Sequence, residues 1–208
     1  MKVMITLFTN IPKQYFDMLN NDGIIVCDIT KSWMYNEDKQ FSFAYDWLKS
    51  EFIKRKHAIE LYNTKYFPIW TFYKYDGKNS NEHFEKYDDT VAQLTLQYDE
   101  SDVLLSDFDL WHSCLNECKI SLSENEDNEF DAFIKKHNVD RRGLLYDDYV
   151  NGNKYAAEAR DIMLKSWNKI FDLYDENEYI CYKNEEKRIQ GNVKCITKKD
   201  VVDIKYFR

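Results

Sequence analysis

The chain has 208 residues, which is enough for one well-buried domain and short for two. Hydrophobic residues make up 44% of it and aromatic residues 16%, which is too many for a disordered chain, and the low counts of 5 Gly and 2 Pro argue against a collagen-like or linker-rich one. The net charge of -8 counts against a broad nucleic-acid-binding surface, because such surfaces neutralise phosphates with Lys and Arg.

The sequence predicts neither a membrane span nor a targeting segment. No stretch approaches the roughly 18 apolar residues that a spanning helix needs. The opening apolar run lacks a small-residue cleavage site and is therefore interpreted as a strand. The five Cys are an odd number without paired C-x-x-C spacing, as is typical of reduced thiols. We therefore expect a soluble cytoplasmic protein that does not bind membranes.

Apolar periodicity and turn residues predict the elements of the first half in chain order. They are a strand at 3–8, a helix from Pro12 to Gly23, a short strand at 24–27, an amphipathic helix at 41–55, and strands at 67–75 and 90–98. The last two flank Asp76-Gly77, which is a hairpin-type turn signal. We therefore expect these two strands to pair.

The second half is predicted in the same way. Its elements are a strand at 103–105, a helix from Ser106 or Asp107 to about Cys118, helices at 130–137 and 154–174, and strands at 179–182, 189–196 and 204–207. The polar run at 121–128 is predicted to be a surface loop that does not divide the chain. Strands and helices do not alternate regularly, which indicates an α+β fold. We expect one compact domain over 1–208, with an antiparallel or mixed sheet and helices packed on it.

The densest cluster of chemistry-bearing residues is Ser-Asp-Phe-Asp-Leu-Trp-His at 106–112. It lies at a predicted strand-to-helix junction, where backbone N–H groups and the helix dipole favour anions. This position predicts a ligand-facing corner, with Asp107, Asp109 and His112 as candidate catalytic residues. Trp111 would supply a stacking surface for a ligand.

The same residues also have a structural explanation. Ser106 and Asp109 have the spacing of a helix capping box, and the aromatic residues between them could face the core. The Asp-x-Asp pair is compatible with Mg²⁺, and Cys114 with Cys118 is compatible with zinc. The Asp-x-Asp pair lacks the Gly-Ser that precedes it in nucleotidyltransferases, and Cys181 with Cys195 is a poor second pair of zinc ligands, so we assign no metal site.

A second aromatic cluster occupies residues 68–76. On a strand, Trp70 lies on one face and Tyr73 on the other. Aromatic clefts stack nucleobases, nicotinamide or peptide side chains, although core packing explains any single one of these residues more often than a cleft does. Trp70, Tyr73 and Trp111 are therefore candidate ligand-binding residues. Arg141 and Arg142, in a predicted loop, are candidates for binding a phosphate or carboxylate.

Several segments carry a family resemblance. The segments are 44–48, 68–70 with Tyr73 and 76–78, 103–112, 166–171 and 189–191. They resemble a bacterial family known as domain of unknown function 3841. The resemblance implies a bacterial or phage-associated cytoplasmic protein. It also emphasises Trp70, Asp107, Asp109, Trp111 and His112 as characteristic positions of the family.

The sequence favours a binding or interaction protein with an aromatic ligand cleft. The chain lacks the G-x-G-x-x-G, P-loop, G-x-S-x-G and H-E-x-x-H motifs of common enzyme classes. The alternative is a nucleotide-handling enzyme, in its sharpest form an ADP-ribosyltransferase-like protein that uses NAD, with Gln190 on a late strand. A third hypothesis is a protein-interaction factor whose acidic surface meets a basic partner. No cofactor is assigned, and the partner could be a small molecule or a protein.

Overall fold

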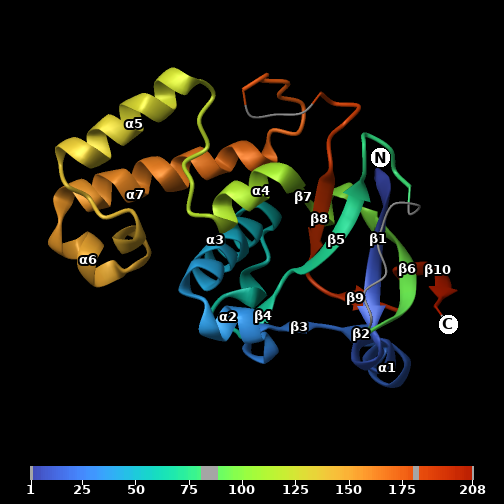
Figure 1. The fold of residues 1–208 in the computed structure, drawn as a ribbon. Coiled ribbons are helices and arrows are strands. Elements are labelled where there is room, and N and C mark those ends of the chain that lie inside the picture. The colour runs from blue at the N-terminus through green and yellow to red at the C-terminus, as the bar shows by residue number, and fades with distance from the viewer. Residues whose placement is uncertain (1, 81–88, 180–182, 208) are drawn as a thin grey trace.

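The structure is a computed structural model that describes residues 2–80, 89–179 and 183–207. It confirms the α+β prediction, with a sheet on one side and a helical layer on the other (Figure 1). The described residues form a six-stranded antiparallel sheet in the order β10-β6-β1-β5-β8-β7. Its strands are β1 (Met4–Pro12), β5 (Ile69–Lys74), β6 (Thr90–Asp99), β7 (Leu104–Asp107), β8 (Ile189–Val193) and β10 (Val201–Tyr206).

The expected pairing of β5 with β6 is wrong. β6 pairs with β1 and β10, whereas β5 pairs with β1 and β8. The Asp76-Gly77 turn is local, with Tyr75 and Lys78 forming an isolated bridge. The Gly77 N–H donates to the Lys187 carbonyl at 3.0 Å, so the turn binds the segment that leads into β8. The N-terminal strand β1 then fills the space between β5 and β6.

Two short strand pairs and a helix lie near one end of the sheet (Figure 1). β2 (Ile24–Ile25) pairs with β9 (Ile196–Thr197), and β3 (Cys27–Asp28) pairs with β4 (Tyr66–Phe67). The predicted strand at 24–27 is thus two strands with different partners. Helix α1 (Lys13–Asp22) ends as predicted at Gly23, whose φ of 75° is a left-handed conformation that glycine adopts readily.

Six further helices are described: α2 (Trp33–Glu37), α3 (Lys39–Lys56), α4 (Phe108–Leu115), α5 (Glu124–Lys136), α6 (Asp147–Gly152) and α7 (Lys154–Trp167). Helix α5 begins inside the predicted loop at 121–128, because Ser123 caps it and three acidic residues occupy its first turn. Helix α7 ends earlier than expected, and a 3-10 turn follows it. In the predicted strand at 179–182, Tyr179 lies in a turn and 180–182 are outside the described residues.

The buried apolar residues form two clusters. The helical cluster unites α3, α4, α5 and α7 around Trp167, while the sheet cluster lies among β1, β6, α1 and the β2–β9 pair. Strand β7 joins the two clusters, because its consecutive residues point to opposite faces. Leu104 belongs to the helical cluster, and Leu105 packs against the sheet cluster. Most of the residues that the sequence singles out lie where the two clusters meet, in β7, in α4 and in the neighbouring strands.

Candidate functional site

One face of the sheet carries buried polar side chains where aliphatic residues would be usual. They are Gln93, Ser106, Gln190 and Asn192. Phe72, Gln190 and Ser106 lie opposite one another on β5, β8 and β7, and Trp70 lies opposite Asn192. Because opposite residues of antiparallel strands project to the same side, these polar groups share a face with Trp70. We call this face of the sheet the polar face.

Strands β1 and β5 separate along most of their length. Their ladder has a single aligned pair, Phe8 opposite Phe72. On one side of that pair, the Asn79 side-chain amide replaces the missing ladder bonds. It donates to the Thr6 carbonyl at 2.8 Å and to the Tyr73 carbonyl at 2.7 Å. On the other side of the pair, the two strands border a cavity.

This cavity, which we call the seam cavity, has a volume of about 270 Å³. It is lined by aromatic residues, isoleucines, one proline and small polar residues: Tyr15, Trp70, Phe72, Ile11, Ile25, Ile69, Ile196, Pro12, Thr9, Asn10 and Cys27. None of these side chains carries a carboxylate, an imidazole, an amine or a guanidinium. Burial, reinforced by nearby negative charge, raises the pKa of the Cys27 thiol and of the Tyr15 hydroxyl, so both groups are neutral at pH 7. The cavity is therefore an uncharged aromatic site.

The Trp70 side chain is fixed in place by a buried relay of hydrogen bonds. Its indole N–H donates to the Gln190 side-chain oxygen, and the Gln190 amide nitrogen donates to the Ser106 hydroxyl at 2.9 Å. The indole also packs edge-on against Phe72, with ring centroids 4.1 Å apart, and lies 5.7 Å from the Phe108 ring. Trp70 is only partly buried, so it presents an oriented aromatic surface to the cavity.

The two carboxylates of the predicted corner have distinct partners. Asp107 is 2% exposed and caps α4, accepting the N–H groups of Asp109 at 2.9 Å and Leu110 at 3.0 Å. Burial raises the pKa of this carboxyl, although its backbone hydrogen bonds oppose the effect. Asp109 forms a two-point ion pair with Arg188, whose Nε lies 3.1 Å from Asp109 Oδ2. The capping box expected between Ser106 and Asp109 is therefore absent, because Asp107 is the capping residue.

His112 and Trp111 project from α4 in different directions. His112 is exposed, its Nδ1 lies 2.8 Å from the Phe108 carbonyl oxygen, and its ring packs edge-on against the Phe108 ring. Trp111 is 3% exposed and packs against Tyr45 within the helical cluster. The structure thus brings Trp70 and His112 against the Phe108 ring, with Arg188, the partner of Asp109, over the same ring, and it assigns Trp111 to core packing.

The remaining candidates lie elsewhere. Tyr73 is on the opposite face of β5 from Trp70 and packs against the sheet cluster. Arg141 forms an ion pair with Asp131 of α5, and Arg142 is exposed at the start of a 3-10 turn. Both arginines belong to the helical layer and do not line the seam cavity.

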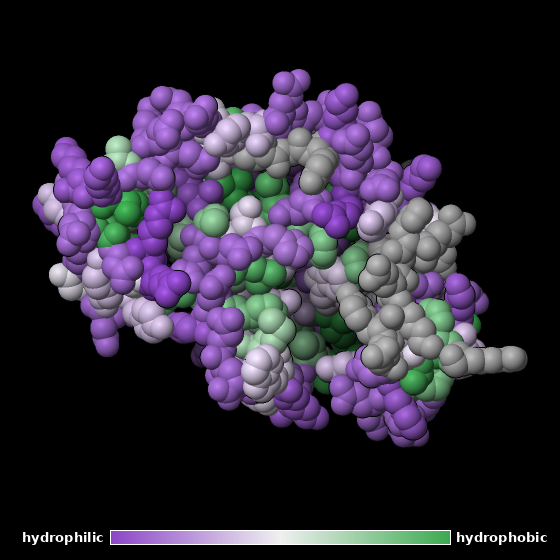
Figure 2. Space-filling model, viewed as in Figure 1, coloured by the Kyte–Doolittle hydropathy of each residue, from purple (hydrophilic) through white to green (hydrophobic). Residues whose placement is uncertain are grey.

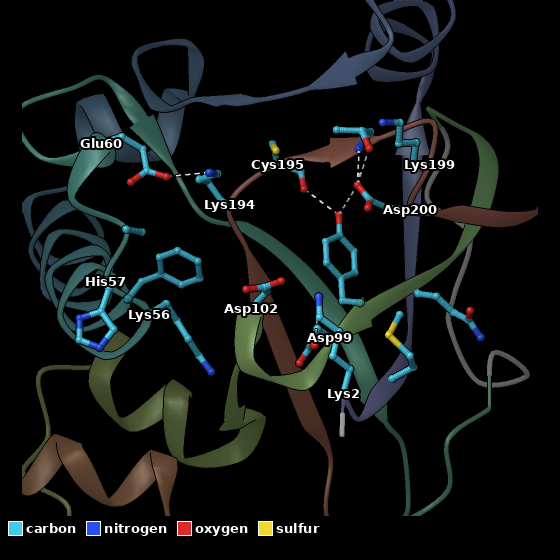
Figure 3. A pocket seen from close by; sticks show the side chains of 16 residues that line it. Lys2, Lys56, His57, Glu60, Asp99, Asp102, Lys194, Cys195, Lys199 and Asp200 are labelled. Atoms are coloured by element: carbon cyan, nitrogen blue, oxygen red, sulfur yellow. Dashed lines mark hydrogen bonds and ion pairs between the residues drawn. The ribbon is translucent and has the colours of Figure 1, made fainter.

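A second cavity, of about 520 Å³, has a different character (Figure 3). Oppositely charged residues on its walls pair with one another, as in the Lys194–Glu60 ion pair at 2.6 Å. The Tyr98 hydroxyl donates to the Cys195 carbonyl at 2.7 Å and lies 3.2 Å from Asp200. None of the candidate residues from the sequence lines this polar cavity. We therefore place the candidate site at the seam cavity.

Sequence reasoning missed several residues of this site. Arg188 pairs with Asp109, and Asn192 lies opposite Trp70 and Leu104, only because β8 lies between β5 and β7, which no local pattern predicts. The sequence predicts only a helix at Tyr15, yet this residue lines the seam cavity. The alternation of polar Gln190 and Asn192 around Gly191 was the available signal for a polar strand face.

Two further features of the described residues concern metal ligands and membrane helices. No group of three or more His, Cys, Asp or Glu side chains among them is placed to hold a metal ion. No helix of the described part of the chain is long and apolar enough to cross a membrane. In the view of Figure 2, most of the outer surface is hydrophilic, and hydrophobic side chains show as smaller patches, several of them in the middle of the molecule.

Comparison with known proteins gives one match. No curated protein and no solved structure matches the chain. A family model described as Domain of unknown function (DUF3841) matches residues 6–202. The match includes both the seam cavity and the corner at the start of α4. Because it covers nearly the whole sequence, the chain belongs to the DUF3841 family.

Proposed function

We propose that the protein is a binding module that holds a small planar ligand in the seam cavity, stacked against Trp70. The observation that carries this proposal is the cavity itself, in which three aromatic residues and four isoleucines surround a few neutral polar groups. Such a lining is typical of small-molecule sites, where apolar walls supply affinity and a few polar atoms set orientation. The hydrogen bond from Trp70 to Gln190 supports it further, because a fixed indole loses little freedom on binding.

The size of the cavity narrows the class of ligand. Ligand pockets commonly enclose about 300–1,000 Å³. The seam cavity, at about 270 Å³, lies just below that range. A single or fused ring therefore suits it better than a whole dinucleotide. We also propose a cytoplasmic location, because the four described cysteines are all free thiols.

The nucleotide-handling alternative finds less support. Asp107, Asp109 and His112 do not line the seam cavity. The two carboxylates are occupied by the α4 cap and by Arg188, and Gln190 is bonded to Trp70 and Ser106. NAD hydrolysis by the purified protein, if lost when the three candidate catalytic residues are replaced by Ala, would establish the enzyme in place of the binding module.

A thermal-shift and calorimetric titration with indole, benzofuran, adenine and nicotinamide tests the proposal. A ligand at 100 times its Kd adds about 2.7 kcal/mol to stability, which corresponds to a rise in Tm of roughly 5–10 °C for a domain of this size. We expect at least one of these ring compounds to bind. No binding by any of the four contradicts the proposal.

Matched tryptophan variants locate the binding. Trp70→Ala should abolish it, while Trp33→Ala should leave it intact because Trp33 is 75% exposed and does not line the cavity. A second variant, Cys27→Phe, adds a ring to another wall of the cavity and should also prevent binding. Equal affinity in all three variants would show that the ring compound binds elsewhere.

A further inference from the structure

Two buried oxygen atoms on the polar face lack a hydrogen-bond partner. They are Gln93 Oε1 and Asn192 Oδ1, and each residue is only 2% exposed. Nearly all buried polar groups in folded proteins are hydrogen-bonded, because an unpaired acceptor away from water loses its solvation without compensation. Among the described residues, these are the two buried side-chain atoms that remain unpaired.

Each of the two residues lies opposite a residue that lines the seam cavity. Asn192 lies directly opposite Trp70 in the β5–β8 ladder. Gln93 lies opposite Asn10 in the β1–β6 ladder, and its amide nitrogen donates to Asn10 Oδ1 at 3.0 Å. Trp70 and Asn10 both line the cavity. Neither Asn192 nor Gln93 lines the cavity itself; each lies one strand further from the seam, opposite a residue that does.

Both acceptors lie on the same face of the sheet. Phe8 and Phe72 are paired across the seam, and Asn10 and Trp70 are each two residues from that pair along a strand. Side chains two residues apart on a strand project to the same side. Trp70, Asn192 and Gln93 therefore face the same way, and Asn192 is the cross-strand neighbour of the indole against which a flat ligand would stack.

We propose that the ligand of the seam cavity is a planar heterocycle or aryl amide with N–H donors on its edge, and that Asn192 Oδ1 accepts one of them. This inference rests on the proposed function and specifies its ligand class. Gln93 Oε1 is the second acceptor, on the far side of the seam. Asn192 is thus a specificity-determining residue, because a site built to accept a hydrogen bond discriminates against a ring that cannot donate one.

Indole and benzofuran provide the test, since they have the same ring size and differ in having an N–H group or an oxygen atom. We expect indole to bind the full chain at least tenfold more tightly than benzofuran in calorimetric titrations. In Asn192→Leu, the two affinities should agree within about twofold, since the acceptor is gone. The matched control Asn125→Leu, on the exposed surface of α5, should retain the difference.

A second readout separates recognition from a structural role. Asn192→Leu should keep or raise the Tm of the ligand-free protein, because the variant removes an acceptor that has no partner to lose. A marked fall in Tm would show that the Asn192 side chain is needed for the fold, and it would overturn the inference.

The outcomes distinguish a failure of the donor requirement from a failure of the proposed ring site. If indole and benzofuran bind wild type equally, the ring site stands and the donor requirement is wrong. If neither compound nor any other ring binds, the seam cavity is not a ligand site, and both proposals fail. The comparison of the two compounds on wild type needs no variant, so it decides the question even if Asn192→Leu does not fold.

Discussion

At the scale of single residues, the corner at the start of α4 shows how one pattern supports two interpretations. The sequence favoured either a catalytic pair or a capping box, and the structure uses Asp107 as the cap and Asp109 as the partner of Arg188. The cap could be foreseen, because Asp before a helix is a common N-cap. The ion pair could not, because Arg188 is 79 residues further along the chain.

Asp107 provides a direct test of the capping role. Asp107→Ala should lower the free energy of unfolding by about 1 kcal/mol, because two backbone N–H groups lose their acceptor. Asp107→Asn keeps an acceptor oxygen and removes a buried charge, so at pH 7 it should be at least as stable as wild type. Chemical denaturation of the two variants measures the difference. Equal losses in both variants would show that the charge itself stabilises the protein.

The pH dependence of stability gives a second test at this residue. Burial raises the pKa of Asp107 in the folded state above its unfolded value, so folding is penalised once the carboxyl ionises. The advantage of Asp107→Asn over wild type should therefore be full above the folded pKa and should disappear as the pH falls to the unfolded pKa. Denaturation curves between pH 4 and pH 7 measure it. An advantage that grows toward low pH would contradict the sign of this shift.

At the scale of elements, the divergence of β1 from β5 is the feature that creates the site. Local patterns predicted both strands, because each has β-branched and aromatic residues with a clear turn or helix after it. They did not predict the pairing, since the order of strands in a sheet depends on contacts between distant segments. The seam cavity could not be predicted for the same reason, because its lining residues come from six separate elements: β1, β5, α1, β2, β3 and β9.

The Asn79 bridge should hold the opposite end of the seam closed. Asn79→Ala removes two hydrogen bonds to backbone carbonyls and should cost about 1 kcal/mol of stability. Asn79→Asp should cost more, because a carboxylate would face the Thr6 and Tyr73 carbonyl oxygens. Thermal denaturation and amide exchange of β1 would show both effects, with Asn151→Ala on exposed α6 as the control. Unchanged exchange in β1 would show that the bridge does not secure the seam.

At the scale of the whole molecule, the sheet and the helical layer depend on each other through β7. Leu104 packs into the helical cluster and Leu105 packs against the sheet cluster, so neither layer is complete without this strand. The sequence already indicated one domain, because no linker separates the two halves. It could not indicate that a four-residue strand joins two cores, because this depends on where β8 and α4 lie around it.

This arrangement predicts cooperative unfolding of the whole chain. Trp167 is fully buried in the helical cluster and donates its indole N–H to the Cys118 carbonyl at 2.8 Å. Trp167→Ala should cost about 3–5 kcal/mol and lower the single calorimetric transition by roughly 10 °C. The exposed control Trp33→Ala should leave it unchanged. Two transitions, of which only one moves, would show that the layers unfold as separate domains.

The central claim is that Trp70 forms the wall of a ligand site, and the indole N–H signals of ¹⁵N-labelled protein test it most directly. Trp70→Phe identifies the Trp70 signal, and the exposed Trp33 provides an internal reference. On titration with indole, the Trp70 signal should move in a saturable way while the Trp33 signal stays fixed, because the ring stacks beside the N–H that Gln190 holds. Binding that leaves the Trp70 signal unmoved, or that shifts Trp33 instead, would contradict the placement of the site in the seam cavity.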